Sequence, residues 1–277
     1  MEKTKKTINS WLYRWLSKDL GKPGFPLCDF EQICRGVKPC DVLLIEGTTR
    51  ISHQIRHLTN SSWSHACLYM GRITDIDNPY LRQVISQAYQ GDPSDQLVFE
   101  SLMGEGAIIS PLTRYKDDHI RICRPRGLLR SDGQKIIHYC INALGKAYSL
   151  RQIFDLLRLF FPWGLLPRKF ASSLFRLKKD EPTEVCSSLL AKAFISVEFP
   201  LIPMVKIIEQ GEISIYHRNP KLFTPRDFDY SPYFDIIKYP MITINYEPDY
   251  HALPWAEEAE HVFKNDDGGE TRIMLGN

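Results

Sequence analysis

The segment around Cys186 is the part of the sequence that most directly suggests covalent chemistry. Residues 182–185 lead into Cys186, and apolar residues then recur at 189, 190, 193, 194 and 197, which is the spacing of a buried helix face. In the first turn of such a helix, unsatisfied N–H groups and the positive end of the helix dipole favour a thiolate and can hold an oxyanion. Cys186 is therefore a candidate nucleophile, although a cysteine on a buried helix is more often a packing residue.

Two other residues are candidates for the partners that a thiol nucleophile needs. His65 begins an apolar strand directly after a polar loop, so we expect a half-exposed ring with a pKa near neutrality. Glu100 interrupts another apolar strand, and a buried carboxylate needs a cationic or hydrogen-bonding partner such as an imidazole. Cys186, His65 and Glu100 thus form a candidate catalytic triad. The alternative for His65 is a structural histidine at the end of a strand.

The elements that must position these residues follow from apolar periodicity. Several strands succeed one another without intervening helices, which favours an antiparallel sheet, and a helix-rich half follows. The fold class is therefore α+β. We expect strands at 41–46, 65–70, 83–89, 96–101, 106–110 and 119–123, helices at 50–58, 131–144 and 184–198, and one or two strands with loops within 212–240.

Composition excludes several classes of protein. The chain has 277 residues, 35 Lys and Arg against 33 Asp and Glu, and 43% hydrophobic residues, which argues against a disordered, collagenous or coiled-coil chain. A net charge of +2 gives no field that would concentrate the protein on nucleic acid. We therefore expect no nucleic-acid partner.

The cysteines and histidines do not suggest a metal site. The chain has 7 cysteines, and a chain of this length does not need disulfides, so reduced thiols in the cytoplasm are expected. Cys28, Cys34 and Cys40 recur every six residues rather than in zinc-site pairs. His53 and His57 are one helical turn apart without a third ligand, and His119 lies in no motif. We predict no metal and no cofactor.

Two segments have an amphipathic composition. Residues 8–20 place Trp and Leu on one helical face and basic residues around it, and residues 150–179 are apolar, aromatic and basic but broken by Pro162. Neither suits a spanning helix, and the N-terminus lacks the apolar run of a secretory signal. For residues 8–20 the alternatives are a helix docked on the domain and a helix lying in a membrane surface. For residues 150–179 they are a buried connector and a lid or membrane-facing surface. We expect a cytoplasmic protein and consider peripheral membrane contact through both segments.

Several motifs in a fixed order resemble a known family, the circularly permuted NlpC/P60 group of papain-like cysteine hydrolases, in particular its YiiX/YaeF-like branch. The candidate residues occur in the family's order His, Glu, Cys. The matching motifs are its opening strand (38–44), its serine-histidine strand (64–71), its glutamate strand (98–101), its glycine-tyrosine motif (144–149), its nucleophile helix (185–191) and its closing segment (224–228). The resemblance covers about residues 38–235.

The resemblance implies a role for each matching residue. Cys186 would be the nucleophile, His65 the general base and then acid, and Glu100 the residue that orients the imidazole. Tyr148 and Ser187 would contribute to substrate binding. The sequence departs from the family at three positions, where it has Cys40 for glycine, Ser149 for aspartate and Ser188 for glutamate. The loss of two acids weakens any expectation that the site grips a free amine.

The resemblance also implies an organisation and a reaction. We expect an amphipathic helix within 1–24, a permuted papain-like domain over 38–240 with a helical insertion at 150–179, and a partly disordered extension at 241–277. The expected activity is hydrolysis of an amide or ester bond in a peptide, amide or lipid-like substrate through a thioester, as in an amidase or peptidase. The alternatives are a lipid acyl hydrolase or acyltransferase, and a catalytically silent module that binds a lipid or peptide.

Overall fold

The computed structural model of the chain describes residues 16–21, 27–145, 186–207, 213–242, 261–264 and 270–273. Tyr148, Ser149, the segment 150–179 and residues 8–15 lie outside the described residues. The chain divides into two units, Met1–Met241 and Ile242–Asn277. The first unit contains the sheet and all three members of the candidate triad.

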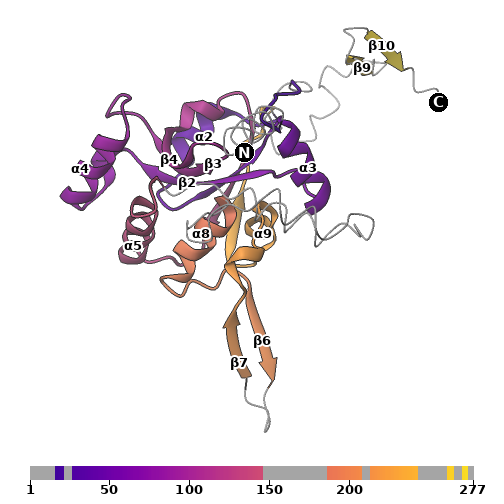
Figure 1. The fold of residues 1–277 in the computed structure, drawn as a ribbon. Coiled ribbons are helices and arrows are strands. Elements are labelled where there is room, and N and C mark those ends of the chain that lie inside the picture. Colours follow the sequence, from indigo (N-terminus) through magenta and orange to yellow (C-terminus); the bar gives the residue numbers. More distant parts are fainter. Residues whose placement is uncertain are drawn as a thin grey trace, which may run out of the picture. The chain divides into compact units, whose positions relative to one another are not determined.

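A six-stranded sheet organises the first unit (Figure 1), with the strands in the order β4-β3-β2-β1-β5-β8. Every neighbouring pair is antiparallel, which confirms the α+β class with an antiparallel sheet. The five strands before residue 126 are short runs rich in apolar residues. α-Helices at Arg50–Thr59 and Pro79–Ala88 separate the first three of them, so strands without intervening α-helices occur only among the last three. The strands are β1 (Val42–Glu46), β2 (His65–Gly71), β3 (Leu97–Leu102), β4 (Gly106–Pro111), β5 (His119–Pro125) and β8 (Phe234–Ile237).

The two faces of the sheet bury separate hydrophobic clusters. In β1, Val42 and Leu44 belong to one cluster, whereas Leu43 and Ile45 belong to the other, as the period of a strand requires. Helix α8 (Cys186–Ile195) packs on β2 and β3 within the first cluster, and α5 (Arg130–Ile141) packs on α8. Helix α2 (Phe30–Gly36) lies on the opposite face through Ile33 (Figure 1). The sheet and α8 together fix the direction in which the first residue of α8 points.

Shorter elements complete this unit. They are α3 (Arg50–Thr59), α4 (Pro79–Ala88), α9 (Pro225–Tyr230) and the 3₁₀ turns η1 (Ile73–Asp75), η2 (Leu112–Tyr115) and η4 (Pro220–Leu222). In the part of the chain that the structure describes, no helix is both long and apolar enough to cross a membrane.

The prediction of a strand at 83–89 is wrong, because this segment belongs to helix α4. The Asn78 side chain caps the helix by accepting from Tyr80 N–H, and Pro79 occupies the first turn, where its fixed φ favours a helix. Leu81 and Ile85, four residues apart, are buried. The cap and this spacing outweigh the β-branched residues that suggested a strand.

The helix expected over residues 8–20 does not reach residue 20. Leu16 is helical and buried, but Asp19 pairs with Thr49 and the Leu20 N–H donates to the Thr48 carbonyl at 3.1 Å. Gly21 has a φ of +84°, which a glycine adopts without strain. The described end of this segment is therefore docked on the domain.

A two-stranded hairpin follows α8, formed by β6 (Pro203–Ile207) and β7 (Ile213–His217). It points away from the sheet (Figure 1). Val205 pairs with Ile215 and Ile207 with Ile213, so one face of the hairpin carries four β-branched side chains, all of them exposed. Within the second unit, β9 (His261–Lys264) and β10 (Glu270–Ile273) pair antiparallel, strands that the sequence did not predict.

Candidate active site

The candidate triad lies where two neighbouring strands of the sheet diverge. β2 pairs with β3 only as far as Leu68 and Phe99, whereas β3 continues to pair with β4 and β2 with β1. His65 and Glu100 both lie beyond the last β2–β3 pair, on facing strands. The divergence leaves the backbone of Ala66 free to contact a side chain from another element.

Cys186 supplies that side chain from the first turn of α8. The side chain is buried, with 5% of the residue exposed. Hydrogen bonds join its sulfur to the His65 side chain and to the backbone of Ala66 and Ser187. The thiol thus has the helix N-terminal environment expected from the sequence, together with a donor from the open edge of β2.

Glu100 completes a chain of contacts from the thiol. His65 Nε2 lies 2.8 Å from Glu100 Oε2, and the two side chains are 16% and 0% exposed. The Tyr115 hydroxyl donates to the same oxygen, Oε2. The structure therefore places Cys186, His65 and Glu100 in a continuous series of contacts.

The ionisation of the pair follows from its charges. Burial on its own lowers the pKa of His65, but the adjacent Cys186 thiolate and Glu100 carboxylate outweigh burial and raise that pKa to about 10. Burial on its own raises the pKa of Cys186, but the His65 imidazolium and the hydrogen bonds to the sulfur lower it overall. From the sequence we expected a half-exposed histidine with a pKa near neutrality, and the difference arises because two negative groups enclose the ring. Both shifts favour the form of the pair with a Cys186 thiolate and a His65 imidazolium.

Glu100 remains a carboxylate inside the protein. Burial raises its pKa, but hydrogen bonds from His65, Ser110 and Tyr115 more than compensate and lower it. Among the described residues, Oε1 has no partner at hydrogen-bond geometry. The carboxylate is therefore contacted at hydrogen-bond distance chiefly through Oε2, which faces the imidazole.

Cys186 differs from every other cysteine of the chain in its ionisation. All seven are among the described residues and all are reduced. Burial, the largest cause in each case, raises the pKa of the other six thiols, including Cys34, which is more exposed than Cys186. The Cys186 pKa alone is lowered. A thiolate forms there because of a partner rather than because of exposure to solvent.

The residues expected to bind substrate are only partly described. The Ser187 hydroxyl is buried and donates to the Phe223 carbonyl at 2.7 Å, so a contact with substrate would fall to the Ser187 backbone N–H rather than to its side chain. Ser188 is fully buried. Tyr148 lies outside the described residues, and its role stays a prediction.

Tyr115 is the member of this group that sequence reasoning missed. It lies in η2, 15 residues after Glu100, in a segment without motif or periodicity. The contact depends on β3 and β4 forming a complete hairpin that returns the chain to Glu100. A weak signal was the tyrosine itself, because a tyrosine that ends up buried usually finds a partner for its hydroxyl.

The sequence predicts that the cysteines and histidines outside the candidate triad form no metal site. Across the described ranges, no group of three or more His, Cys, Asp or Glu side chains is arranged to hold a metal ion. His53 lies beside the guanidinium of Arg56, with His53 Nδ1 and Arg56 Nη2 3.1 Å apart.

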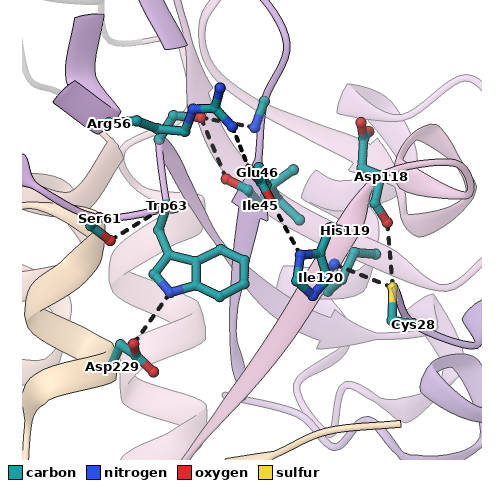
Figure 2. Close-up of polar contacts among 12 residues, drawn as sticks. Cys28, Ile45, Glu46, Arg56, Ser61, Trp63, Asp118, His119, Ile120 and Asp229 are labelled. Carbon is teal, nitrogen blue, oxygen red and sulfur yellow. Dashed lines mark hydrogen bonds and ion pairs between the residues drawn. The ribbon is translucent and has the colours of Figure 1, made fainter. Parts of the chain in front are cut away.

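A second histidine–glutamate pair lies at the same end of the sheet (Figure 2). His119 Nδ1 is 3.0 Å from Glu46 Oε2, and the other oxygen of Glu46 accepts from Arg56. The His119 ring packs against Trp63, with 5.3 Å between ring centroids, and the Trp63 indole N–H donates to Asp229. This group joins β1, β5, α3 and α9.

No family model matches the chain, and no curated protein matches its sequence. Among solved structures, the chain is similar to the metalloprotein YiiX from Escherichia coli O157:H7 (DUF1105), with 14% sequence identity and a TM-score of 0.44, over 73% of this chain and 98% of that chain. The chain thus has a YiiX-like protein as a distant structural neighbour.

Proposed function

We propose that the protein is a cysteine hydrolase that cleaves an amide or ester bond through an acyl thioester on Cys186. The observation that carries the proposal is the continuous contact from Cys186 through His65 to Glu100, in which Cys186 is the one cysteine with a lowered pKa. A buried thiolate is unfavourable unless it has a partner. A site that maintains one beside an imidazolium is suited to nucleophilic catalysis.

The residues present account for each proton of the proposed reaction. The Cys186 thiolate attacks the carbonyl carbon and forms the sulfur–carbon bond, while N–H groups of the first turn of α8 stabilise the oxyanion. The His65 imidazolium then protonates the leaving nitrogen or oxygen as its bond to carbon breaks. Neutral His65 next takes a proton from water, whose oxygen attacks the thioester and releases the acid and the thiolate. Glu100 orients the imidazole and stabilises its charged form.

The proposal includes the circularly permuted papain-like fold. It is supported by the chain order of the three residues, His65 on β2, Glu100 on β3 and Cys186 on the later helix α8, and by the packing of α8 on those two strands. Ordinary papain-like enzymes have the cysteine first. An experimental structure with α8 and β2 far apart would remove this part of the proposal.

The substrate class within the proposal is an amide, with an amphiphilic ester as the second candidate. The amide follows from the family resemblance, since lipid acyl hydrolysis belongs to a related branch of the permuted group. At position 188, where the family has an acid, this chain has the uncharged and fully buried Ser188. We therefore propose a substrate recognised without a salt bridge to a free amine at that position.

Labelling by a small electrophile tests whether Cys186 is a reactive nucleophile. At pH 7, we expect an alkylating agent to modify Cys186 faster than Cys34, with the modified residue identified by mass spectrometry. Cys34 is the matched control because it is the more exposed thiol and its pKa is raised. If modification follows exposure, so that Cys34 reacts first, the hydrolase proposal loses its basis and a silent binding module becomes the better description.

Screening identifies the bond that is cleaved. Wild-type protein and Cys186→Ala are compared on a library of peptide amides and a library of acylated lipids. Turnover that disappears in Cys186→Ala supports the proposal, and the library in which it occurs decides between amide and lipid ester. Turnover that persists in the variant would contradict a role for Cys186.

A further inference from the structure

The Glu100 carboxylate is stabilised by hydrogen bonds from His65, Ser110 and Tyr115, and two of these donors meet on a single oxygen. The Oε2 atom contacts His65 Nε2 from β2 and accepts from the Tyr115 hydroxyl of η2, whereas Oε1 has no partner at hydrogen-bond geometry among the described residues. Two donors from separate elements therefore converge on a single oxygen. A carboxylate with one donor can turn about its terminal torsion, which is broad, but two donors in different directions fix its plane.

We infer that Tyr115 is a positioning residue that holds Glu100 in the orientation in which Oε2 faces His65. The inference deepens the proposed function and rests on it for its effect on turnover. It assigns to Tyr115 no contact with the substrate. Tyr115 acts on Glu100, Glu100 on the imidazole, and the imidazole on Cys186.

Tyr115 is itself held firmly enough for this role. It is 7% exposed and belongs to the hydrophobic cluster on the α2 face of the sheet, together with Val98 and Ile120. The turn that carries it is anchored at its start, where Leu112 N–H donates to the Gln96 carbonyl at 2.7 Å, and at its end, where Asp118 N–H donates to the Tyr115 carbonyl at 3.0 Å. Its ring also lies near His65, with 6.1 Å between centroids.

The chemistry of the phenol suits a permanent donor. Burial, together with the charge of Glu100, raises the pKa of Tyr115 well above 10, so the hydroxyl keeps its proton over the whole range in which the site is active. The other titratable groups that act on Glu100, Tyr115 or both are His65 and Cys67 from β2, Cys186 through His65, and Arg114 from η2. Cys67 has a strongly raised pKa, so the carboxylate is stabilised by the imidazole and by the hydroxyls of Ser110 and Tyr115.

The test compares Tyr115→Phe with Tyr69→Phe. Both variants remove one buried tyrosine hydroxyl from the same hydrophobic cluster, but the Tyr69 hydroxyl contacts Gln96 rather than Glu100. The rate of Cys186 alkylation is measured against pH for each protein. We expect Tyr115→Phe to move the acid limb of that profile to higher pH by about one unit, since a hydrogen bond to a charged group is worth about that much. Tyr69→Phe should leave the limb in place.

Turnover supplies a second readout. On the substrate found by screening, Tyr115→Phe should lower kcat about tenfold with little change in KM, because the lost hydrogen bond acts on the imidazole and not on the substrate. If the two variants give superimposable alkylation profiles and equal losses of melting temperature, Tyr115 is a packing residue and the inference is wrong. Wild-type protein without turnover would overturn the proposed function. The role of Tyr115 would still be decided, because the acid limb of the alkylation profile is measured without a substrate.

Discussion

The molecule contains two histidine–glutamate pairs at the same end of its sheet, and they differ in what surrounds them. His65–Glu100 and His119–Glu46 have similar separations of 2.8 and 3.0 Å. His65 pairs across the sheet with Ile45, the residue before Glu46, so the pairs are close neighbours. Glu100 is fully buried, whereas the Glu46 side chain is 31% exposed and also binds Arg56.

The surroundings decide what each pair can do. Arg56 neutralises Glu46 (Figure 2), and a partly exposed pair of this kind contributes little to stability. Glu100 instead accepts hydrogen bonds from His65 and from the hydroxyls of Tyr115 and Ser110, and His65 also contacts the sulfur of Cys186. A histidine next to a carboxylate is therefore no sign of catalysis by itself. Burial and a neighbouring nucleophile distinguish the candidate site, as does the lack of a fixed cation beside Glu100 among the residues that the structure describes.

Replacement of each histidine should give the largest contrast. We expect His65→Ala to lower turnover by more than about a thousandfold, because the thiolate loses its counterion and its proton donor. His119→Ala removes the equivalent ring from the second pair and should leave kcat/KM near the wild-type value. Steady-state kinetics measure both, and a His119 variant as inactive as the His65 variant would place the chemistry at the wrong pair.

The two glutamates provide a smaller contrast of the same kind. Glu100→Gln keeps the shape but not the charge, and should lower turnover by roughly tenfold to a thousandfold, with the circular dichroism spectrum nearly unchanged. Glu46→Gln should change unfolding free energy by about 1 kcal/mol or less and leave turnover unaffected. Parallel losses of melting temperature and activity in Glu100→Gln would indicate a structural carboxylate.

The pH dependence of turnover should report the pair of Cys186 and His65. The active thiolate–imidazolium form requires a pH above the lowered pKa of Cys186 and below the raised pKa of His65, about 10. We therefore expect a bell-shaped profile of kcat/KM with its alkaline limb near pH 10, and both limbs belong to the coupled pair. A profile that keeps rising beyond pH 10 would mean that a neutral imidazole suffices.

The free energy of unfolding should also depend on pH, through Glu100 and His65. Its change should be smaller than the change in turnover. Because the pKa of Glu100 is lowered from 4.5 on folding, its contribution is present above pH 4.5 and is lost as the pH falls through the lower folded value. The pKa of His65 is raised from 6.5 to about 10, so its contribution is complete below pH 6.5 and is lost as the pH approaches 10. Denaturant unfolding across pH 3 to 10 should show both losses in wild type. The acid-side loss should shrink in Glu100→Gln but persist in Glu46→Gln.

The sequence predicts the parts of this site that depend on local pattern. The strands of His65 and Glu100 and the helix of Cys186 follow from apolar periodicity. His65 and Cys186 begin their elements, and Glu100 interrupts the apolar run of its strand. The Glu46–His119 pair could not be predicted, since it depends on the pairing of β1 with β5, which are distant in sequence. Tyr115 could not be predicted because it lies in a turn without periodicity, which the β3–β4 hairpin returns to Glu100. The strand expected at 83–89 fails for a different reason, because the capping residue Asn78 determines a helix that β-propensity does not reveal.

The β6–β7 hairpin should unfold locally while the rest of its domain stays folded. Its strands contact chiefly each other, and a lone two-stranded hairpin with exposed side chains is marginally stable in water. Its backbone amides should therefore exchange hydrogen for deuterium through local opening, whereas those of β1, which is paired on both edges and buried on both faces, should exchange only when the whole domain unfolds. Protease digestion under native conditions should cut first between residues 203 and 217, leaving the strands of His65 and Glu100 intact.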